Sequence, residues 1–168
     1  FKWLRECTAR SPGLLTDVGI GTFFEPTGLA VDEGPPPVAR ADRVARRLQI
    51  DGRDCIFMPA IPIDVALIRG SVADTEGNIS LSDEPVNGGA LQMAMAARTS
   101  GGKVIAVVKS LTQAGTLHPR QVQVPGIFVD AVVVDPQARQ SQDAREPAFT
   151  GEIRLPEVPL PSDRKSVV

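Results

Sequence analysis

The glycine pair Gly19-x-Gly21 is the pattern in this sequence that comes closest to a nucleotide-binding motif. A dinucleotide fingerprint needs a third small residue three positions further on, where a helix begins beside the pyrophosphate. That position holds Phe24, and no Gly-Lys-Ser/Thr run follows any glycine loop. The pair therefore predicts a loop or a close approach between backbones, and neither a dinucleotide fingerprint nor a phosphate-cradling P-loop is present.

Few side chains could act as acids, bases, nucleophiles or metal ligands. His118 stands in a predicted loop, without an adjacent Ser or Cys, so we interpret it as a solvated or backbone-bonded histidine. Cys7 and Cys55 fall on helix-like and strand-like patterns, which is typical of small buried hydrophobic residues. A zinc site needs about four N or S ligands. Two cysteines and one histidine cannot supply them, so we expect no metal site.

Charged residues at two places could take part in binding. Glu76 precedes Gly77-Asn78, where a glutamate could serve as an acid, a base or a nucleophile. Its neighbours are typical turn residues, so we interpret Glu76 as a solvated turn charge. Arg43, Arg46 and Arg47 are spaced to share one face of a helix. The sequence leaves open whether this basic face is only solvated or contacts an anion.

The composition is that of an ordinary globular domain. The chain has 168 residues, of which 42% are apolar and 23% charged, and its net charge is -2. Basic and acidic residues are mixed along the chain, which gives no electrostatic case for a nucleic acid or an anionic membrane as partner. The apolar stretches are too short to span a bilayer. The two distant cysteines indicate a reducing compartment, for which we expect the cytoplasm.

The elements that would position these residues begin with a helix over residues 1–10. Residues 14–24 are apolar and glycine-rich, which predicts a buried strand that continues into a loop. Two short apolar runs around Asp51-Gly52 predict a β-hairpin. The nearly continuous aliphatic run 63–69 predicts a strand covered on both faces, and a turn follows at 74–78.

A helix and two further strands follow that turn. Residues 86–100 are apolar without a breaker after Gly89, which predicts a buried helix, and Gly101-Gly102 ends it. Residues 103–108 and 129–134 are predicted to be buried strands. The alternation predicts the α/β class, with an open, mainly parallel sheet flanked by helices.

We expect this α/β domain to occupy residues 1–136. Residues 137–146 are polar, and 155–161 carry prolines at short intervals, which is typical of extended backbone. Residues 137–168 are therefore predicted to form a polar and Pro-rich linker. The first residue is not Met, and we expect the chain to be a fragment or a processed subunit.

Five segments follow one another in an order that is typical of one enzyme family. The most specific is PIDVALIRGSVADTEGNIS (62–80), with an Asp-x-x-Gly-Asn signature in its turn. SPGLLTDVGIGTF (11–23) is similar to the segment PGLxTxVGLGTF. The remaining three are KVIAVV (103–108), GTLHPR (115–120) and VPGIFVDAVVV (124–134). Together they resemble the first half of the family I coenzyme A transferases of the acyl-CoA:acetate or 3-ketoacid type.

The resemblance implies a ping-pong reaction. A glutamate attacks the acyl-CoA thioester, an acyl-glutamyl anhydride forms, and CoA passes through a glutamyl-CoA thioester to a carboxylic or 3-keto acid. In the family that glutamate lies in a Ser-Glu-Asn-Gly-like motif of the second half, and this sequence has no such motif. We therefore expect no catalytic residue here, CoA as co-substrate without another cofactor, and a partner that is a second half or β subunit. The resemblance also implies an oligomer that serves fatty acid or ketone-body metabolism.

The loop after the first predicted strand is our candidate for contact with the acyl group. In open α/β sheets, ligands bind outside the carboxyl ends of the strands. The expected substrate-binding residues are small, hydroxyl-bearing or aromatic: Gly19, Gly21, Thr22, Phe24, Thr27 and Gly28. The alternative, in which the aromatic residues belong to the core and the glycines only pack, stays open.

A function of a different class is also compatible with the sequence. Folds related to this one serve as sugar-phosphate or effector-binding domains, and such a domain would need anion-binding Arg, Lys or backbone amides clustered at strand ends. A purely structural role within a larger protein is a third possibility.

Overall fold

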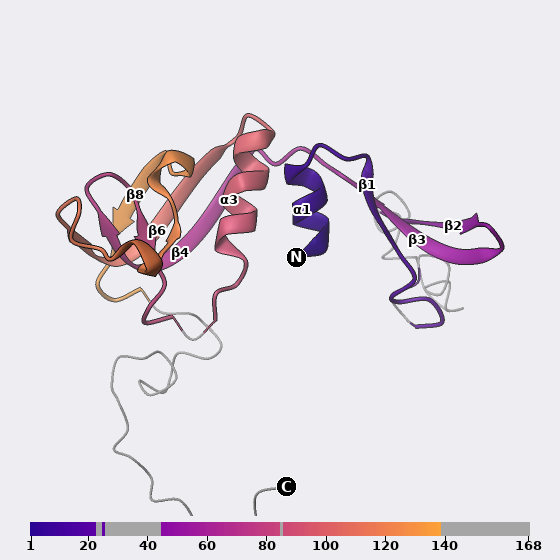
Figure 1. Ribbon diagram of the computed structural model, residues 1–168, viewed down its shortest axis with the longest axis horizontal. Coiled ribbons are helices and arrows are strands. Elements are labelled where there is room, and N and C mark those ends of the chain that lie inside the picture. Colours follow the sequence, from indigo (N-terminus) through magenta and orange to yellow (C-terminus); the bar gives the residue numbers. More distant parts are fainter. Residues whose placement is uncertain (23–24, 26–44, 85, 139–168) are drawn as a thin grey trace, which may run out of the picture.

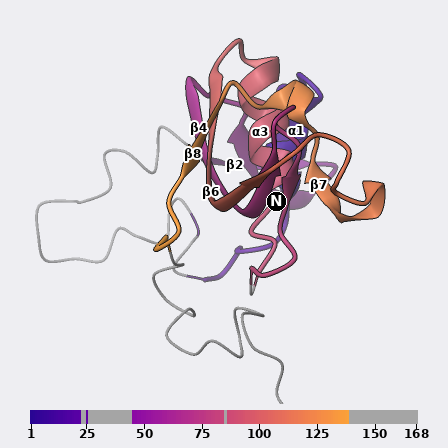
Figure 2. The same ribbon diagram turned by 90° about the vertical axis from the view of Figure 1, so that its left-hand side faces the viewer.

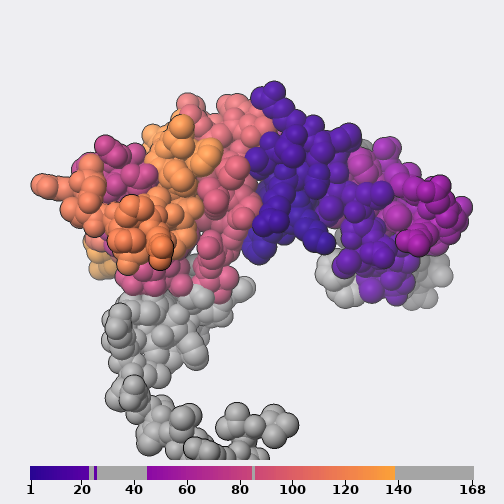
Figure 3. Space-filling view, viewed as in Figure 1, coloured from indigo at the N-terminus to yellow at the C-terminus, as the bar shows by residue number. Residues whose placement is uncertain are grey.

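The computed structural model of the protein describes residues 1–22, 25, 45–84 and 86–138. Figure 1 shows an arm of antiparallel strands (β1–β3) and a body in which a helix packs on a second sheet (α3 and β4–β8). Figure 3 shows the N-terminal residues between these two regions. Of the predicted linker, only Gln137 and Ala138 are among the described residues. No helix within the described ranges is long and apolar enough to cross a membrane.

The arm is a three-stranded antiparallel sheet in the order β1-β3-β2. Its strands are β1 (Gly13–Thr16), β2 (Arg46–Ile50) and β3 (Arg53–Pro59). The predicted hairpin is confirmed, because Asp51 and Gly52 join β2 to β3 with φ of 49° and 77°. Two consecutive residues with positive φ are what a two-residue type I′ turn requires.

The predicted N-terminal helix is confirmed as α1 (Lys2–Thr8), which connects the arm to the body. The indole N–H of Trp3 donates a hydrogen bond to the Pro59 carbonyl oxygen at 2.8 Å, which fixes α1 on the end of β3. On its other side α1 lies beside the body helix α3 (Figure 1). The short α1 is therefore held by tertiary contacts, as a helix of this length must be.

The body sheet has five strands in the order β7-β5-β4-β6-β8. The strands β4, β6 and β8 run parallel, whereas β5 is antiparallel to β4 and to β7. This arrangement confirms the predicted α/β class with a mainly parallel sheet. The bounds are β4 Val65–Asp74, β5 Ile79–Ser80, β6 Lys103–Thr112, β7 Val122–Val124 and β8 Ala131–Val134, with 3-10 turns at Pro119–Gln121 and Gly126–Phe128.

The crossover between β4 and β6 contains the predicted buried helix, α3 (Ala90–Thr99). It ends as its sequence predicts, because Gly101 has a φ of 79° and the Gly102 amide donates to the Ala97 carbonyl oxygen at 2.8 Å. The inner side of α3 is made of alanines, so the helix can approach the strands closely. Ala94 and Ala97 are fully buried and pack into the core cluster with Val104 of β6.

The core occupies only one face of the parallel strands. Ala66 and Ile68 of β4 are buried in it, whereas Val65 and Leu67, which alternate with them, are exposed, Leu67 by 69%. The prediction that residues 63–69 are covered on both faces is therefore wrong for the structure of this chain. An unbroken aliphatic run is typical of a parallel strand that is buried on both faces of its sheet. In the described residues of this chain, only one of these faces is covered.

Candidate functional site

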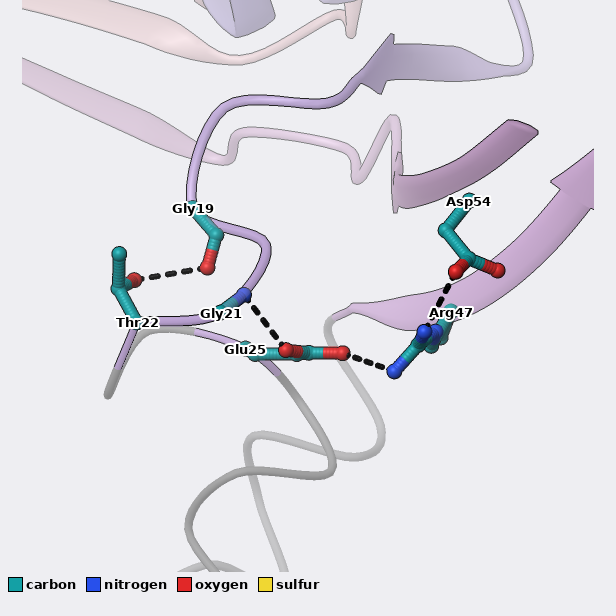
Figure 4. Close-up of polar contacts among 6 residues, drawn as sticks. All are labelled: Gly19, Gly21, Thr22, Glu25, Arg47 and Asp54. Atoms are coloured by element: carbon teal, nitrogen blue, oxygen red, sulfur yellow. Dashed lines mark hydrogen bonds and ion pairs between the residues drawn. The ribbon is translucent and has the colours of Figure 1, made fainter.

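The loop after β1 is held in a compact turn by its own hydrogen bonds. Gly19 and Gly21 have φ of 102° and 74°, which glycine adopts without strain. The Thr22 hydroxyl donates to the Gly19 carbonyl oxygen at 2.7 Å (Figure 4). A side chain at Gly21 would meet open space, so this part of the loop is accessible. These three predicted site residues are therefore brought together, with the Thr22 hydroxyl engaged inside the turn.

Glu25 clamps this loop to the arm. Its buried carboxylate accepts a hydrogen bond from the Gly21 amide at 2.8 Å and forms an ion pair with Arg47 (Figure 4). Arg47 also bridges to Asp54 of β3 at 2.6 Å. The hydrogen bond to Asp54 is the main reason that the pKa of Arg47 is raised, with the charges of Asp54 and Glu25 adding to it. The sequence did not reveal this clamp, since Glu25 and Arg47 are far apart in the chain and no local spacing relates them.

The position of the loop corrects one part of the sequence argument. Residues 14–18 do not form a buried strand of the parallel sheet, because β1 belongs to the antiparallel arm and Val18 is 76% exposed. The rule that ligands bind at the carboxyl ends of parallel strands therefore does not apply to this loop. Three of the predicted binding residues lie outside the described part of the chain: Phe24, Thr27 and Gly28.

The predicted basic helix face is also wrong. Arg46 and Arg47 are consecutive residues of β2, and neighbours in a strand point to opposite sides of the sheet. Arg46 lies over the Phe57 ring, 5.0 Å from its centre, while Arg47 pairs with the two carboxylates of the clamp. Arg43 is outside the described residues.

The signature turn after β4 is a second constellation of polar groups. The Asp74 carboxylate accepts hydrogen bonds from the amides of Glu76 and Asn78 at 3.0 and 2.9 Å and from the Asn78 side-chain amide at 2.9 Å. Burial of Asp74 favours its neutral form, but the hydrogen bonds from Asn78, Glu76 and Gly77 outweigh burial and hold its pKa below the ordinary value. Asp74 is thus a buried, ionised carboxylate that closes the turn.

Asn78 connects this turn to the segment before β8. Its side-chain oxygen accepts a hydrogen bond from the Gly126 amide at 2.9 Å. A Cβ at Gly126 would stand 2.1 Å from the Glu76 carbonyl oxygen, so only glycine permits this approach. Gly77 has a φ of 84°, which confirms the turn predicted from its sequence. We call the unit formed by Asp74, Gly77, Asn78 and Gly126 the signature clasp.

A cavity of about 380 Å³ lies beside the signature clasp. This volume is within the range of small-molecule pockets, and the cavity adjoins the carboxyl end of β4. Its lining combines the clasp with aliphatic side chains: Asp74, Thr75, Glu76, Gly77, Leu111, Val129, Asp130, Ala131, Val132 and Val134. Figure 1 shows the arm on the other side of α1 from β4, β6 and β8, so the described part of the loop, up to Thr22, lies away from this cavity.

Glu76 and His118 behave as their sequence context predicts. Glu76 has an exposed side chain in the turn. His118 is exposed, and its Nδ1 accepts a hydrogen bond from the Arg120 amide at 3.2 Å. Cys7 is buried as predicted, whereas the same prediction is wrong for Cys55, which is half-buried; both are free thiols. Within the described residues, no three His, Cys, Asp or Glu side chains gather as a metal site would require.

The cations Arg98, at the end of α3, and Lys103, at the start of β6, give the anion-binding hypothesis no support. Arg98 and Lys103 both contact the Asp130 carboxylate, at 3.0 and 3.2 Å. The same carboxylate accepts a hydrogen bond from the Val104 amide at 2.9 Å. This backbone hydrogen bond is the main reason that the pKa of Asp130 is lowered. These groups satisfy one another and fix the start of β8 against β6.

Comparison with known proteins places these features in a family. The family described as coenzyme A transferase matches residues 1–135. Caffeate CoA-transferase from Acetobacterium woodii is 36% identical over 162 residues, covering 94% of this chain and 30% of that protein. A 3-oxoadipate CoA-transferase subunit from Pseudomonas putida is 35% identical over 127 residues, covering 76% of this chain and 49% of the subunit.

A solved structure agrees with these relatives. The acyl-CoA transferase from E. coli O157:H7, in a thioester complex with CoA, superposes with a TM-score of 0.72 at 32% identity. The superposition covers 92% of this chain and 31% of that structure, so this chain spans less than half the length of each of these relatives. The signature clasp and the parallel strands around it fall within the range that the family description matches. This chain therefore belongs to the coenzyme A transferase family.

Proposed function

We propose that this chain is a non-catalytic part of a CoA-transferase that moves CoA between an acyl-CoA and a carboxylic or 3-keto acid. The nucleophilic glutamate would lie on another segment or another chain. The observation that carries the proposal is the family match over residues 1–135, in a sequence without a Ser-Glu-Asn-Gly-like motif. We call the segment or chain that carries the glutamate the complement. The combination favours a division in which the present chain shapes the substrate-binding site and the complement performs the covalent chemistry.

The proposed reaction divides one exchange into steps of moderate difficulty. The glutamate carboxylate attacks the thioester carbonyl carbon, and the CoA thiolate leaves as an acyl-glutamyl anhydride forms. The thiolate then attacks the glutamyl carbonyl carbon, which releases the first carboxylate and leaves a glutamyl-CoA thioester. The acceptor carboxylate then attacks the glutamyl-CoA thioester and releases the CoA thiolate, which forms a second anhydride. The thiolate attacks the acceptor's carbonyl carbon in this anhydride, so that the new acyl-CoA leaves and the glutamate is restored.

The carboxylates near the loop and the signature clasp are poor candidates for the nucleophile. Glu76 stands exposed in a turn, and Glu25 is committed to Gly21 and Arg47. Asp74 accepts three hydrogen bonds, which stabilise its carboxylate and reduce its nucleophilicity. We accordingly expect the covalent intermediate to form on the complementing polypeptide.

Peptide mass mapping after incubation with acyl-CoA tests this assignment. With the complement present, we expect the CoA mass to be attached to the glutamate of the complement's Ser-Glu-Asn-Gly-like motif. The peptides of this chain should carry no adduct. A CoA adduct on Glu76, or on any other carboxylate of this chain, would contradict the proposed division of labour.

We also propose that the loop from Gly19 to Gly28 contacts the acyl group. The accessible backbone at Gly21 and the aromatic side chain that the sequence places at position 24 support this role, and the Glu25 carboxylate ties Gly21 to Arg47 of the arm. The finer assignments of a cytoplasmic oligomer in fatty acid or ketone-body metabolism are further parts of the proposal.

The Phe24→Ala variant tests the role of the loop in the reconstituted enzyme. We expect its preference among acyl chain lengths to shift by about tenfold, because the loss of an aromatic wall enlarges a binding pocket. The melting temperature should stay within a few degrees of the wild-type value. The proposed contact with the acyl group is contradicted if the variant keeps both the acyl preference and the melting temperature of the wild type. It is also contradicted if the variant unfolds, because Phe24 would then have a purely structural role.

A further inference from the structure

The loop after β1 is tied to the arm through a chain of charged groups. We call residues 19–22 together with Glu25 the clamped turn. Glu25 accepts the Gly21 amide and pairs with Nη1 of Arg47 in β2, and Nη2 of the same arginine pairs with Asp54 of β3 (Figure 4). Figure 1 places the clamped turn on the arm side of α1, and Figure 2, viewed from the body side, shows the arm behind the body. The contacts drawn in Figure 4 therefore hold the turn from the arm.

Arg47 joins two carboxylates that differ in exposure. The Glu25 side chain is 9% exposed, whereas the side chains of Arg47 and Asp54 are 40% and 39% exposed. An ion pair between exposed groups contributes little, but a buried carboxylate that loses its cation is costly. Removal of Arg47 would therefore act mainly on Glu25 and, through it, on the Gly21 amide.

The clamp orders backbone that is accessible to a ligand. Gly19 and Gly21 have positive φ, and a side chain at Gly21 would meet open space. The Gly21 amide is engaged by Glu25, so a ligand would contact the open side of this glycine and not its N–H. Glycine loses more conformational freedom than any other residue when it is ordered. A clamp that orders the turn in advance removes this cost from ligand binding.

We propose that Arg47 is the positioning residue of the clamped turn, which through Glu25 holds the Gly21 backbone in place for the acyl group of acyl-CoA. This inference rests on the role of the loop proposed above. It adds that the affinity for acyl-CoA depends on an arginine of the arm that acts through a second residue. Arg46, the preceding residue, has no such role, because it lies on the other face of the arm over the Phe57 ring.

Two measurements test the role of Arg47. The first follows hydrogen exchange of the Gly21 amide by NMR in this chain and reports on the clamp itself. The second measures the Kd for acetyl-CoA by isothermal titration calorimetry of this chain paired with its complement. In this pair, glutamine replaces the glutamate that the family resemblance implies for the complement, so that acetyl-CoA can bind without reacting.

The variants separate the clamp from the charge of the arm. Arg47→Met and Glu25→Gln each remove the ion pair, and a third variant combines both substitutions. Arg46→Met is the matched control, because it removes a neighbouring arginine from the other face of the same strand.

We expect the Gly21 amide to exchange about tenfold faster in Arg47→Met than in the wild type or Arg46→Met, because the Glu25 carboxylate is released to water. The Kd for acetyl-CoA should rise about fivefold or more in Arg47→Met and in Glu25→Gln, since binding must then order the turn. The Kd of Arg46→Met should stay within about twofold of the wild-type value. The combined variant should bind about as weakly as Arg47→Met, because both substitutions break one interaction.

Unchanged exchange of the Gly21 amide in Arg47→Met would overturn the clamp. An unchanged Kd in both single variants, or effects that multiply in the combined variant, would overturn the link between the clamp and binding. If Arg47→Met does not fold, Glu25→Gln decides the question, because it removes the ion pair without leaving a buried charge. A pair with the wild-type chain that binds no acetyl-CoA contradicts the proposed function, and exchange of the Gly21 amide then still decides whether Arg47 holds the turn.

Discussion

Replacing Asp74 by alanine is expected to lower the free energy of unfolding by about 3 kcal/mol or more. The Asp74 carboxylate accepts hydrogen bonds from the amides of Glu76 and Asn78 and from the Asn78 side chain. Hydrogen bonds to a charged group contribute roughly 1.5–3 kcal/mol each, although not additively, and their loss leaves buried donors without a partner. Since a domain has only about 5–15 kcal/mol of stability, urea denaturation should reveal the change clearly.

Two control variants separate the signature clasp from an ordinary surface carboxylate. Asp135→Ala removes an exposed carboxylate that accepts one amide, that of Gln137 at 3.0 Å, and should cost no more than about 1 kcal/mol. Glu76→Gln should lie within about 0.5 kcal/mol of the wild type, because the side chain is exposed. If Asp74→Ala and Asp135→Ala have the same effect, Asp74 does not organise the turn.

The pH dependence of the same variants gives an independent readout. The pKa of Asp74 is held below its ordinary value of 3.8, so the folded state favours the ionised carboxylate. The stability contributed by ionisation is fully present above the unfolded pKa and is lost as the pH falls through the folded pKa. The difference in stability between the wild type and Asp74→Asn should therefore be constant above about pH 5 and should narrow below pH 3.8.

Where local chemistry determines the structure, the sequence was sufficient to predict it. Asp51-Gly52 predicts a two-residue turn because both residues tolerate positive φ, and the hairpin forms there. Gly101 ends α3 for the same reason. The strands at 103–108 and 129–134 were recognisable from aliphatic runs, and the βαβ order predicted that they are parallel. The prediction that 129–134 is a buried strand was wrong, because β8 is mostly exposed at the edge of the sheet. The family resemblance also singled out the Asp-x-x-Gly-Asn signature of the turn after β4. The structure shows that residues of this signature form the signature clasp.

Where distant segments decide the structure, the sequence was insufficient. Residues 14–18 have the composition of a buried strand, but pairing with β3 places them in the antiparallel arm. Arg46 and Arg47 follow Arg43 at spacings that suit one face of a helix, yet pairing with β3 makes these two residues part of a strand. The ion pair between Glu25 and Arg47 joins residues 22 positions apart, and only the folded arm brings them together.

The most direct test of the central claim is CoA exchange measured on this chain alone and with its complement. The complement is the part of the A. woodii relative that the shared region does not cover, co-expressed with this chain. Transfer of label from free acetate into acetyl-CoA reports the complete ping-pong cycle, because both half-reactions must occur for label to move. A parallel preparation serves as the control: in it, glutamine replaces the glutamate that the family resemblance implies for the complement.

We expect the chain alone to show no exchange above the uncatalysed background. The co-expressed pair should exceed that background by at least about 10³-fold, since covalent catalysis depends on one nucleophile whose removal costs that much or more. The glutamine control should return to background. Exchange by this chain alone that persists after repurification, or exchange by the pair that survives the glutamine substitution, would contradict the account that the chain shapes a CoA-transferase without supplying its nucleophile.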